Sequence, residues 1–283
     1  GETVCVVGES GSGKSVSSLS MMRLVEFGGG KIKGGKLNFQ KQVGGKIDLA
    51  NATQRSMRHT RGNEIGMIFQ EPMTALNPVF TVGRQLTEGL RLHKNLSKHQ
   101  AKLRAIELLD QVRIPEPKNR LNQYPHELSG GMRQRVVIAM ALACEPRLLI
   151  ADEPTTALDV TIQAEILALI DRLKRETGTA VMFITHDMAV VAQMADRVVV
   201  MYRGNKVEEG NVKDVFENPQ HDYTKSLLSA VPKLGEMLGK KYPEPMKLLG
   251  ENKKNTKPLI GTDEILLDVK NLVTRFPVAG GLL

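Results

Sequence analysis

Cysteine, tryptophan and aromatic residues in general are scarce in this sequence. Its 283 residues include two cysteines and no tryptophan, and aromatic residues make up 4% of the chain. Two thiols are too few for a fold built on disulfides or for a zinc site with several thiolate ligands. Cys5 and Cys144 both lie in apolar runs, so we expect both to be buried and unreactive.

Long hydrophobic runs are also absent. No run approaches the roughly 18 apolar residues of a membrane-spanning helix, so any membrane role is expected to be peripheral. Hydrophobic residues make up 41% and charged residues 25% of the chain, a balance that permits a buried core. The net charge of +8 is compatible with nucleic acid, an anionic lipid surface or a partner with acidic loops, and it does not choose among them.

Short apolar runs rich in β-branched residues alternate along the chain with helical patterns. The runs are typical of strands buried on both faces, and they lie at Val4–Val7, Leu148–Ala151, Ala180–Thr185 and Arg197–Met201. This alternation predicts an α/β fold in which helices cover the faces of a parallel sheet. One helical segment has apolar residues at helical spacing from Ile162 to Leu173.

Two segments depart from this alternation. Gly28–Gly45 is rich in glycine and lysine, and we expect loops and short antiparallel strands there, a partial antiparallel β subdomain. From Leu86 to Glu145 the pattern is mostly helical, which predicts a helical subdomain inserted at about residues 84–145. Ser97 and Gln100 have the spacing of a capping box for the helix that runs to Gln111.

A glycine-rich segment directly follows the first predicted strand and precedes a helical pattern from Val16 to Val25. It matches the P-loop pattern in full, with Gly8, Glu9, Ser10, Gly11, Ser12, Gly13, Lys14 and Ser15. Backbone N–H groups of such a loop cradle phosphate oxygens, and the dipole of the following helix adds to the attraction. We expect Lys14 to reach the β- and γ-phosphates of a nucleotide and the Ser15 hydroxyl to bind Mg²⁺.

Two adjacent carboxylates, Asp152 and Glu153, end the predicted strand that begins at Leu148. The carboxyl edge of a parallel sheet is where ligands bind in open α/β folds. We expect Asp152 to hold the metal ion, directly or through water, and Glu153 to position or deprotonate the attacking water. Different environments for the two carboxylates would suit these separate roles.

Further motifs resemble, in their order along the chain, those of ATP-binding cassette (ABC) ATPases. Leu128–Gln134 resembles the signature motif, Gln70 the Q-loop, Ala157–Asp159 the D-loop and His186 the switch histidine. Together with the P-loop and the two carboxylates, the resemblance covers residues 1–201.

The resemblance implies a P-loop NTPase fold of the RecA type and an ATPase whose hydrolysis drives transport, a translocase. Gln70 would contact Mg²⁺ and the attacking water, and His186 the γ-phosphate. Ser129, Gly130 and Gly131 open a helix, so they would form a second anion-binding helix N-terminus that closes over the γ-phosphate of a head-to-tail partner domain. Asp159 of the D-loop is expected among the nucleotide-binding residues as well.

The sequence around these motifs resembles that of a narrower class, the importers of dipeptides, oligopeptides and nickel. It does so at Phe69–Pro78, Asp152–Thr161 and Pro219–Leu228, although the class usually has proline where this chain has Asp222. The resemblance implies membrane permease subunits, indirectly a periplasmic or lipid-anchored substrate-binding protein, and a place at the cytoplasmic face of the bacterial inner membrane. ATP and Mg²⁺ are the expected cofactors. No cysteine follows Cys144, so we expect no iron–sulfur cluster, and the two cysteines of the chain are too few for zinc.

The expected domains are a nucleotide-binding domain at 1–216, an importer-type extension at 217–250, a linker at 251–264 and the start of a second nucleotide-binding domain at 265–283. Phe276 falls where the family has its adenine-stacking aromatic. The matching aromatic of the first domain would precede Gly1, so we expect a fragment that binds ATP weakly. Tandem domains of this kind occur in glutathione and peptide importers, which makes glutathione or a small peptide the expected cargo.

Other interpretations stay open on the sequence. The cargo could be general dipeptides, oligopeptides or nickel, because an ATPase subunit does not itself contact cargo. A soluble ABC ATPase that acts on nucleic acid fits the net charge, but the sequence lacks a long coiled coil, a zinc site and an arginine-rich tail. We therefore expect no nucleic acid as partner. The second nucleotide-binding domain would come from the tandem chain or from a homodimer.

Overall fold

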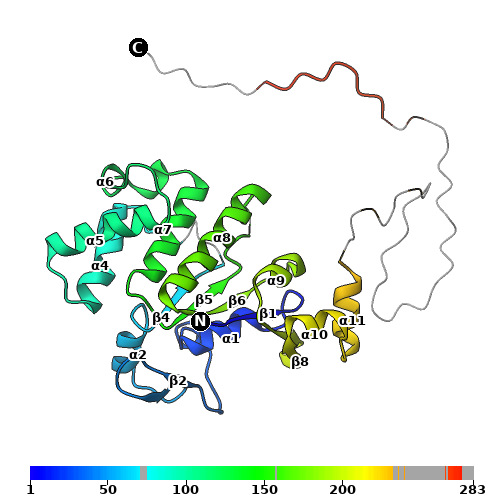
Figure 1. The fold of residues 1–283 in the computed structure, drawn as a ribbon, viewed down its shortest axis with the longest axis horizontal. Helices are drawn as coiled ribbons and strands as arrows, with labels where there is room; N and C mark the ends of the chain where they lie inside the picture. Colours follow the sequence, from blue (N-terminus) through cyan, green and yellow to red (C-terminus); the bar gives the residue numbers. More distant parts are fainter. Residues whose placement is uncertain are drawn as a thin grey trace. The chain divides into compact units, whose positions relative to one another are not determined.

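The computed structural model describes residues 1–70, 75–156, 158–231, 235, 239, 265 and 267–275. The chain divides into two compact units, residues 1–231 and residues 232–283. The sheet and the labelled helices of Figure 1 belong to the first unit. Ala157 of the D-loop motif, residues 71–74 after Gln70, the expected linker and Phe276 lie outside the described residues.

Six strands of the described residues form one sheet in the order β4-β5-β6-β1-β7-β8. The parallel strands are β1 (Thr3–Val7), β4 (Ile65–Ile68), β5 (Leu148–Asp152), β6 (Ala180–Ile184) and β7 (Arg197–Tyr202), and β8 (Asn205–Asn211) pairs antiparallel with β7. The four apolar runs predicted as parallel strands are β5, β6, β1 and β7, which are consecutive in the sheet. The predicted α/β fold is therefore confirmed, and β4 is an additional parallel strand that was not predicted.

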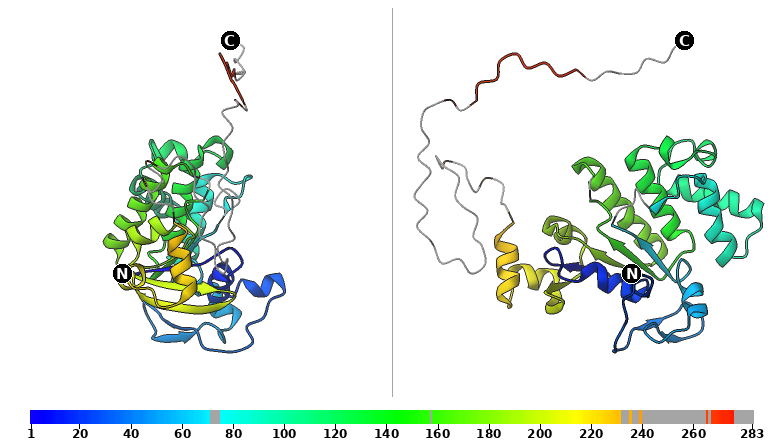
Figure 2. Two further views of the ribbon diagram at one scale, coloured as in Figure 1. Left: turned by 90° about the vertical axis from the view of Figure 1, so that its right-hand side faces the viewer. Right: turned by 180° about the vertical axis from the view of Figure 1, so that it is seen from behind.

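Helices surround the sheet, as the views in Figures 1 and 2 show. Their bounds are α1 Lys14–Met21, α2 Gln54–Thr60, α4 Val82–His93, α5 Lys98–Gln111, α6 Pro117–Arg120, α7 Gly130–Leu142, α8 Val160–Thr177, α9 Met188–Met194, α10 Val212–Glu217 and α11 Asp222–Ser229, with 3-10 turns η1 Val25–Gly28 and η2 Pro125–Glu127. Helix α1 is shorter than the predicted pattern. It ends at Met21 because Arg23 has φ 50, outside the right-handed helical region.

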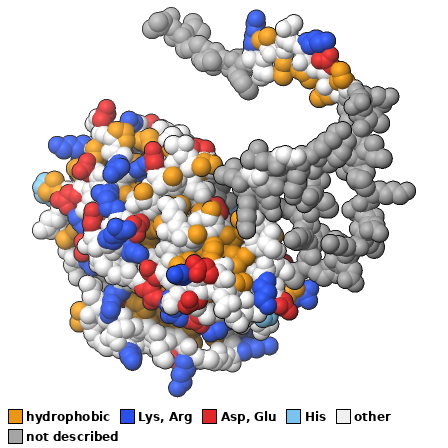
Figure 3. All heavy atoms as spheres, turned by 45° about the vertical axis from the view of Figure 1, so that its right-hand side comes forward, with side chains coloured by type: hydrophobic (Ala, Val, Ile, Leu, Met, Phe, Trp, Pro, Cys, Tyr) orange, Lys and Arg blue, Asp and Glu red, His pale blue; other side chains and the backbone are white. Residues whose placement is uncertain are grey.

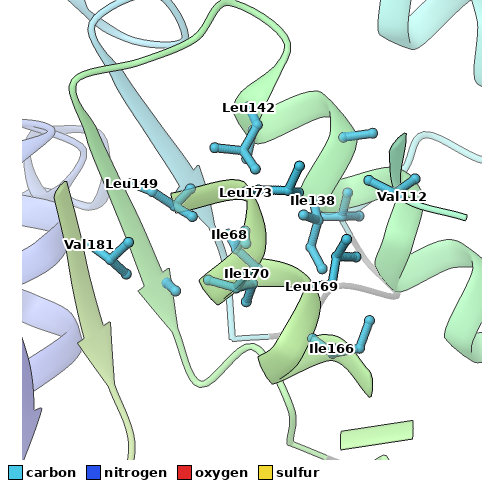
Figure 4. Packing of buried hydrophobic residues seen from close by; sticks show 14 of the residues in the cluster. Ile68, Val112, Ile138, Leu142, Leu149, Ile166, Leu169, Ile170, Leu173 and Val181 are labelled. Carbon is cyan, nitrogen blue, oxygen red and sulfur yellow. The ribbon is translucent and has the colours of Figure 1, made fainter. Parts of the chain in front are cut away.

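Alternate residues of the central strands point to opposite faces of the sheet, since side chains along a strand alternate with a period of two. Cys5, Leu149 and Phe183 belong to the larger core, which includes the buried residues of α7 and α8. Figure 4 shows Ile170 and Leu173 of α8 directed toward side chains of the sheet and of α7. The predicted burial of both cysteines is confirmed, and burial raises the pKa of Cys5 to about 12.

The opposite face of the sheet carries a smaller core and a hollow. Met22, Met57, Ile65 and Ile150 form this second core beside α1 and α2. A hollow of about 760 Å³ lies along the same face, where it is lined by apolar side chains that include those of Val4, Val6, Val16, Met182, Val199 and Met201. Strands β2 (Asn38–Gln40) and β3 (Lys46–Asp48) form a separate antiparallel pair, within and just beyond the segment predicted to contain short antiparallel strands.

Helices α4 to α7 form a block inserted between the neighbouring strands β4 and β5. The predicted capping box of α5 is present, because the Ser97 hydroxyl accepts from the Gln100 N–H and the Gln100 side chain accepts from the Ser97 N–H. Arg135 of α7 ties the block together, donating to the Val112 carbonyl at 2.9 Å and pairing with Glu165 of α8 at 2.6 Å.

Helix α11 is regular, although the sequence pattern weakens beyond Glu217. It starts at Asp222, capped by the His221 ring, whose Nδ1 accepts from the Tyr223 N–H at 3.1 Å. Asp222 thus occupies the first helical position, where proline is also tolerated. The helix can therefore start with Asp222 in this chain and with proline in other importers of the class. In the second unit, the described residues 265 and 267–275 form neither helix nor strand.

Candidate functional site

The predicted site residues come from four strand ends at one edge of the sheet. The P-loop follows β1, Asp152 ends β5, and His186 and Gln70 each come two residues after β6 and β4. Strand β6 lies between β1 and β5, and all three are parallel, so their carboxyl ends meet. The fold therefore brings together Lys14, Ser15, Gln70, Asp152, Glu153 and His186.

The backbone of the P-loop depends on glycine at two points. Gly8 has φ 148, and a Cβ there would lie 2.2 Å from the Met201 carbonyl oxygen, so no other residue fits. Gly13, with φ 99, is the left-handed residue that directly precedes α1. Ser10 and Gly11 are exposed at the tip, whereas Ser12 is buried, and its carbonyl accepts from the Gly204 N–H at 3.0 Å.

Lys14 lies inside the loop that it follows. Its side chain is buried, and its ammonium donates to the Gly8 carbonyl at 2.8 Å and to the Glu9 carbonyl at 2.9 Å. Burial lowers the pKa of Lys14 from its ordinary value, and the nearby carboxylates of Glu153 and Asp152 oppose that shift. A lysine ammonium at this point of a P-loop suits the binding of phosphate oxygens.

Asp152 is buried beside two hydroxyl groups of α1. Its Oδ1 accepts from Ser15 at 3.0 Å and its Oδ2 from Ser18 at 3.3 Å. Burial raises the pKa of Asp152 above its ordinary value, although both hydrogen bonds act against that rise. Ser18 was not predicted. It lies one helical turn after Ser15 and so on the same face of α1, which is the signal that could have identified it.

Glu153 is held by three side chains. Its Oε2 accepts from Thr156 at 3.0 Å and from the Gln70 amide at 3.3 Å, and its Oε1 lies 3.3 Å from Nδ1 of His186. Thr156 was not predicted as part of the site. The His186 side chain is 64% exposed, so its ring is also accessible to a bound molecule.

The surroundings of Glu153 favour its charged form. Burial acts to raise the pKa of Glu153, but the hydrogen bonds from Thr156 and His186, together with that from Gln70, outweigh it and leave the pKa below its ordinary value. Its backbone has φ 46, an uncommon value for a residue other than glycine. The two adjacent carboxylates thus have opposite environments, one buried beneath hydroxyls and one at the edge of the site.

The signature and D-loop residues form a second group, separate from the P-loop. Ser129 caps α7 by accepting from the Met132 N–H at 3.3 Å, and Asp159 caps α8 by accepting from the Ile162 N–H at 3.0 Å. A Cβ on Gly131 would lie 3.4 Å from Ile162, so the two helix starts are adjacent. Ser129 and Gly130 are exposed, and no hydrogen bond among the described residues joins this group to the P-loop.

Two features are absent from the described residues, a cluster of metal ligands and a membrane-spanning helix. No group of three or more His, Cys, Asp and Glu side chains is arranged to hold a metal ion. Among the same residues, every helix is too short or too polar to cross a membrane.

Comparison with known families finds two matches in this chain. Residues 1–156, more than half of the chain, match the family described as ABC transporter. Residues 207–256 match the C-terminal region of oligopeptide and dipeptide transporters, a span that includes α10 and α11.

Curated relatives agree with these matches. The chain is 56% identical over 289 aligned residues to the glutathione import ATP-binding protein GsiA of Pectobacterium atrosepticum, and 55% identical to GsiA of Escherichia coli K12. Each alignment covers 100% of this chain and 46% of the relative, so the chain spans about half the length of the curated relatives it matches.

Solved structures share the fold. A dimeric ATP-binding cassette in a post-hydrolysis state, bound to ADP and Pi, has a TM-score of 0.63 at 30% identity, covering 75% of this chain and 85% of that one. The cbiO1 protein of Clostridium perfringens, part of the cbiONQ transporter complex, has a TM-score of 0.60 at 27% identity, covering 77% and 80%. The resemblance predicted from the motifs is confirmed, and this chain belongs to the ABC transporter family.

Proposed function

We propose that this chain binds ATP with Mg²⁺ at the P-loop edge of the sheet and hydrolyses it, as the motor part of a bacterial importer of glutathione or small peptides. One observation carries the proposal: a P-loop lysine, a buried carboxylate bonded to the P-loop serine, and a second carboxylate held by Gln70 and His186 all meet at one edge.

The oxygen atoms around Ser15 fit Mg²⁺. The Ser15 hydroxyl and the Asp152 carboxylate are 3.0 Å apart, and both are the hard oxygen donors that Mg²⁺ prefers. Gln70 would add its amide oxygen from the side of Glu153. When bound, the ion would offset the negative charge of the β- and γ-phosphates. Lys14 and the N–H groups of Gly11 to Ser15 would hold the phosphate oxygens.

Glu153 would act on the attacking water. Both of its oxygens are already oriented, and its lowered pKa keeps the carboxylate charged at neutral pH. A carboxylate with a low pKa is a weak base. That suffices, because phosphoryl transfer passes through a loose transition state in which orienting the water matters more than removing its proton early. His186 would contact the γ-phosphate through its exposed ring while holding Glu153.

The second group of residues would act on a partner's nucleotide. The N-terminus of α7, formed by Ser129, Gly130 and Gly131, is exposed and makes no hydrogen bond to the P-loop in the described part of the chain. Asp159 lies beside it, at the start of α8. In a head-to-tail pair this helix N-terminus would face the γ-phosphate held by the other domain. A second nucleotide-binding domain is therefore proposed as partner, in the tandem protein or as a second copy.

The class of cargo is proposed from the relatives. GsiA proteins are named for glutathione import, and the C-terminal region matches oligopeptide and dipeptide transporters. The proposed partners are membrane permease subunits and, through them, an extracytoplasmic substrate-binding protein, with this chain peripheral at the cytoplasmic face of the inner membrane. No residue of the site selects the cargo, so dipeptides, oligopeptides and nickel are alternatives.

The hydrolysis proposal is tested with Glu153→Gln in the full-length protein. We expect ATP binding to persist and turnover to fall by about 100-fold or more, the loss typical when the side chain that orients the attacking water and accepts its proton is removed. Glu107→Gln, an exposed carboxylate paired with Arg104, is the matched control and should keep wild-type turnover. Unchanged turnover in Glu153→Gln would remove Glu153 from the mechanism.

The cargo proposal is tested by ATPase activity of the full-length protein in liposomes with its membrane subunits. The binding protein would be loaded with glutathione, loaded with a dipeptide, or empty. Stimulation by glutathione alone supports glutathione import, and equal stimulation by dipeptides replaces it with general peptide import. No response to any cargo would contradict the motor role.

A further inference from the structure

Tyr223 connects the C-terminal region to the phosphate-binding loop. Its hydroxyl accepts a hydrogen bond from the Glu9 N–H at 2.8 Å, across a sequence separation of 214. Tyr223 is 5% exposed, and its ring stacks on that of Tyr202 of β7, with ring centroids 4.2 Å apart and an interplanar angle of 28°. A buried, stacked ring has little freedom, so the fold fixes the position of its hydroxyl.

The bond acts on the corner where the loop leaves β1. The Glu9 carbonyl accepts from Nζ of Lys14 at 2.9 Å and from the Ser12 N–H at 3.2 Å, while its N–H is directed at Tyr223. Lys14 thus binds the carbonyl group of Glu9, and Tyr223 of α11 binds its N–H group. Gly8 precedes this residue and Gly11 follows soon after, and glycine imposes little conformational restraint of its own. The hydrogen bonds are therefore what fix the corner.

Helix α11 is in turn fixed to the sheet. The Glu208 carboxylate of β8 accepts from the Gln220 N–H at 2.7 Å and from the His221 N–H at 3.0 Å, just before the helix starts. Burial acts to raise the pKa of Glu208, but the backbone hydrogen bond from Gln220, the nearby Thr224 hydroxyl and the backbone hydrogen bond from His221 together outweigh it. The pKa lies below its ordinary value, so the acceptor is charged at neutral pH. The chain of contacts runs from β8 through α11 to the P-loop.

We propose that Tyr223 is a positioning residue for nucleotide binding, through which helix α11 holds the P-loop in its phosphate-accepting form. The P-loop pattern itself does not contain this contact, which comes from the region that matches oligopeptide and dipeptide transporters. The inference rests on the proposed function for the nature of the ligand, but the conformation of the loop can be measured without any ligand. By linkage, a partner that displaces α11 weakens nucleotide binding, and bound nucleotide resists that displacement.

The test compares Tyr223→Phe with the wild type in the full-length protein. The variant keeps the ring and its stacking and loses the acceptor for Glu9. We expect faster amide hydrogen exchange in the peptide covering residues 8–15 without nucleotide. We also expect about three- to tenfold weaker binding of the non-hydrolysable analogue AMP-PNP with Mg²⁺, the range for one lost hydrogen bond. The KM for ATP should rise by a similar factor and kcat should change less than about twofold, because Tyr223 does not contact the reacting atoms.

Tyr202→Phe is the matched control, since it removes a hydroxyl from the other ring of the stack and no hydrogen bond of the described residues. Glu208→Ala should weaken AMP-PNP binding in the same direction, and its combination with Tyr223→Phe should weaken it by less than the product of the two factors. Wild-type exchange and affinity in Tyr223→Phe would overturn the proposal. If the wild type binds no AMP-PNP, the ATPase proposal fails, and the exchange comparison alone decides the role of Tyr223.

Discussion

At the scale of single residues, the buried carboxylate of Asp152 has an energetic cost. Its pKa is raised in the folded protein by burial, so folding favours the protonated form. The stability that this group contributes is present at pH values below the unfolded pKa and is lost as the pH rises through the folded pKa. At neutral pH the ionised carboxylate therefore destabilises the nucleotide-free protein.

Asp152→Asn should accordingly raise the unfolding temperature of the nucleotide-free protein at pH 7 while abolishing Mg²⁺-dependent ATP binding. Each 1 kcal/mol gained would correspond to roughly 2–4 °C for a domain of this size. The gain should shrink as the pH falls toward the ordinary carboxyl range, which thermal melts at pH 5 and pH 7 would measure. A variant less stable than wild type at pH 7 would contradict this account of Asp152.

Thr156 should control the charge state of Glu153. Thr156→Val removes the 3.0 Å hydrogen bond to Oε2 of Glu153 and so raises the pKa of that carboxyl. The acid limb of the kcat–pH profile should move to higher pH in the variant. Thr155→Val is the control, because the Thr155 hydroxyl makes no hydrogen bond to the described residues. Superimposable acid limbs in Thr156→Val and the wild type would mean that Glu153 does not set this limb.

Two residues that sequence analysis missed make their contacts across long sequence separations. The P-loop and the Asp152–Glu153 pair are contiguous patterns, and such patterns are visible in one sequence. Ser18 reaches Asp152 across 134 positions and Tyr223 reaches Glu9 across 214, so only the folded sheet brings these pairs together. An isolated tyrosine carries no local pattern that distinguishes it from its equivalents, and the only local signal for Ser18 is its place one helical turn after Ser15.

At the scale of elements, the capping box of α5 is a local feature with a testable energy. Ser97→Ala removes the acceptor for the Gln100 N–H, and a lost N-cap costs about 1 kcal/mol. The unfolding temperature should fall by roughly 2–4 °C. Ser97→Thr keeps a capping hydroxyl and should lose less than half as much. Equal melts for Ser97→Ala and the wild type would show that the cap contributes nothing measurable.

The elements predicted well are those specified locally or by long apolar patterns. Continuous runs rich in β-branched residues form four strands, β1, β5, β6 and β7. The capping box of α5 is formed by two residues that are three positions apart, Ser97 and Gln100. Strand β4 was missed because it has four residues, one of which is Gly66. That glycine reflects packing, since a Cβ there would lie 2.2 Å from the Ala141 carbonyl oxygen of α7. Strand β4 is therefore stabilised by its neighbours more than by its own composition.

At the scale of the whole molecule, the distribution of charge bears on the choice of partner. On the face drawn in Figure 3, Lys and Arg side chains are interspersed with Asp and Glu side chains. Proteins that follow a nucleic-acid backbone usually gather their cations into a stripe. That face thus gives no support to the nucleic-acid alternative, and salt-dependent binding of DNA or RNA in a filter assay would revive it.

The proposed head-to-tail pairing predicts a separation of binding from turnover. Ser129→Arg places a large cation at the exposed N-terminus of α7, away from the P-loop of its own domain. In the full-length protein we expect AMP-PNP affinity within about twofold of wild type but ATPase activity reduced by roughly tenfold or more, because a transition-state contact is lost. Affinity and turnover that fell together would instead place α7 at its own domain's nucleotide.

Strands β4 and β5 are neighbours in the sheet, yet the helical block from α4 to α7 lies between them in the chain. The chain leaves β4 after Ile68 and returns to the sheet at Leu148, the first residue of β5. These two strands are held side by side by their own backbone pairing. The length and composition of the part from α4 to α6 can therefore change without altering the 3.0 Å separation of Ser15 and Asp152, whereas α7 carries the signature residues at its start. This insertion point lets the surface of α4 to α6 change independently of the chemistry at the sheet edge.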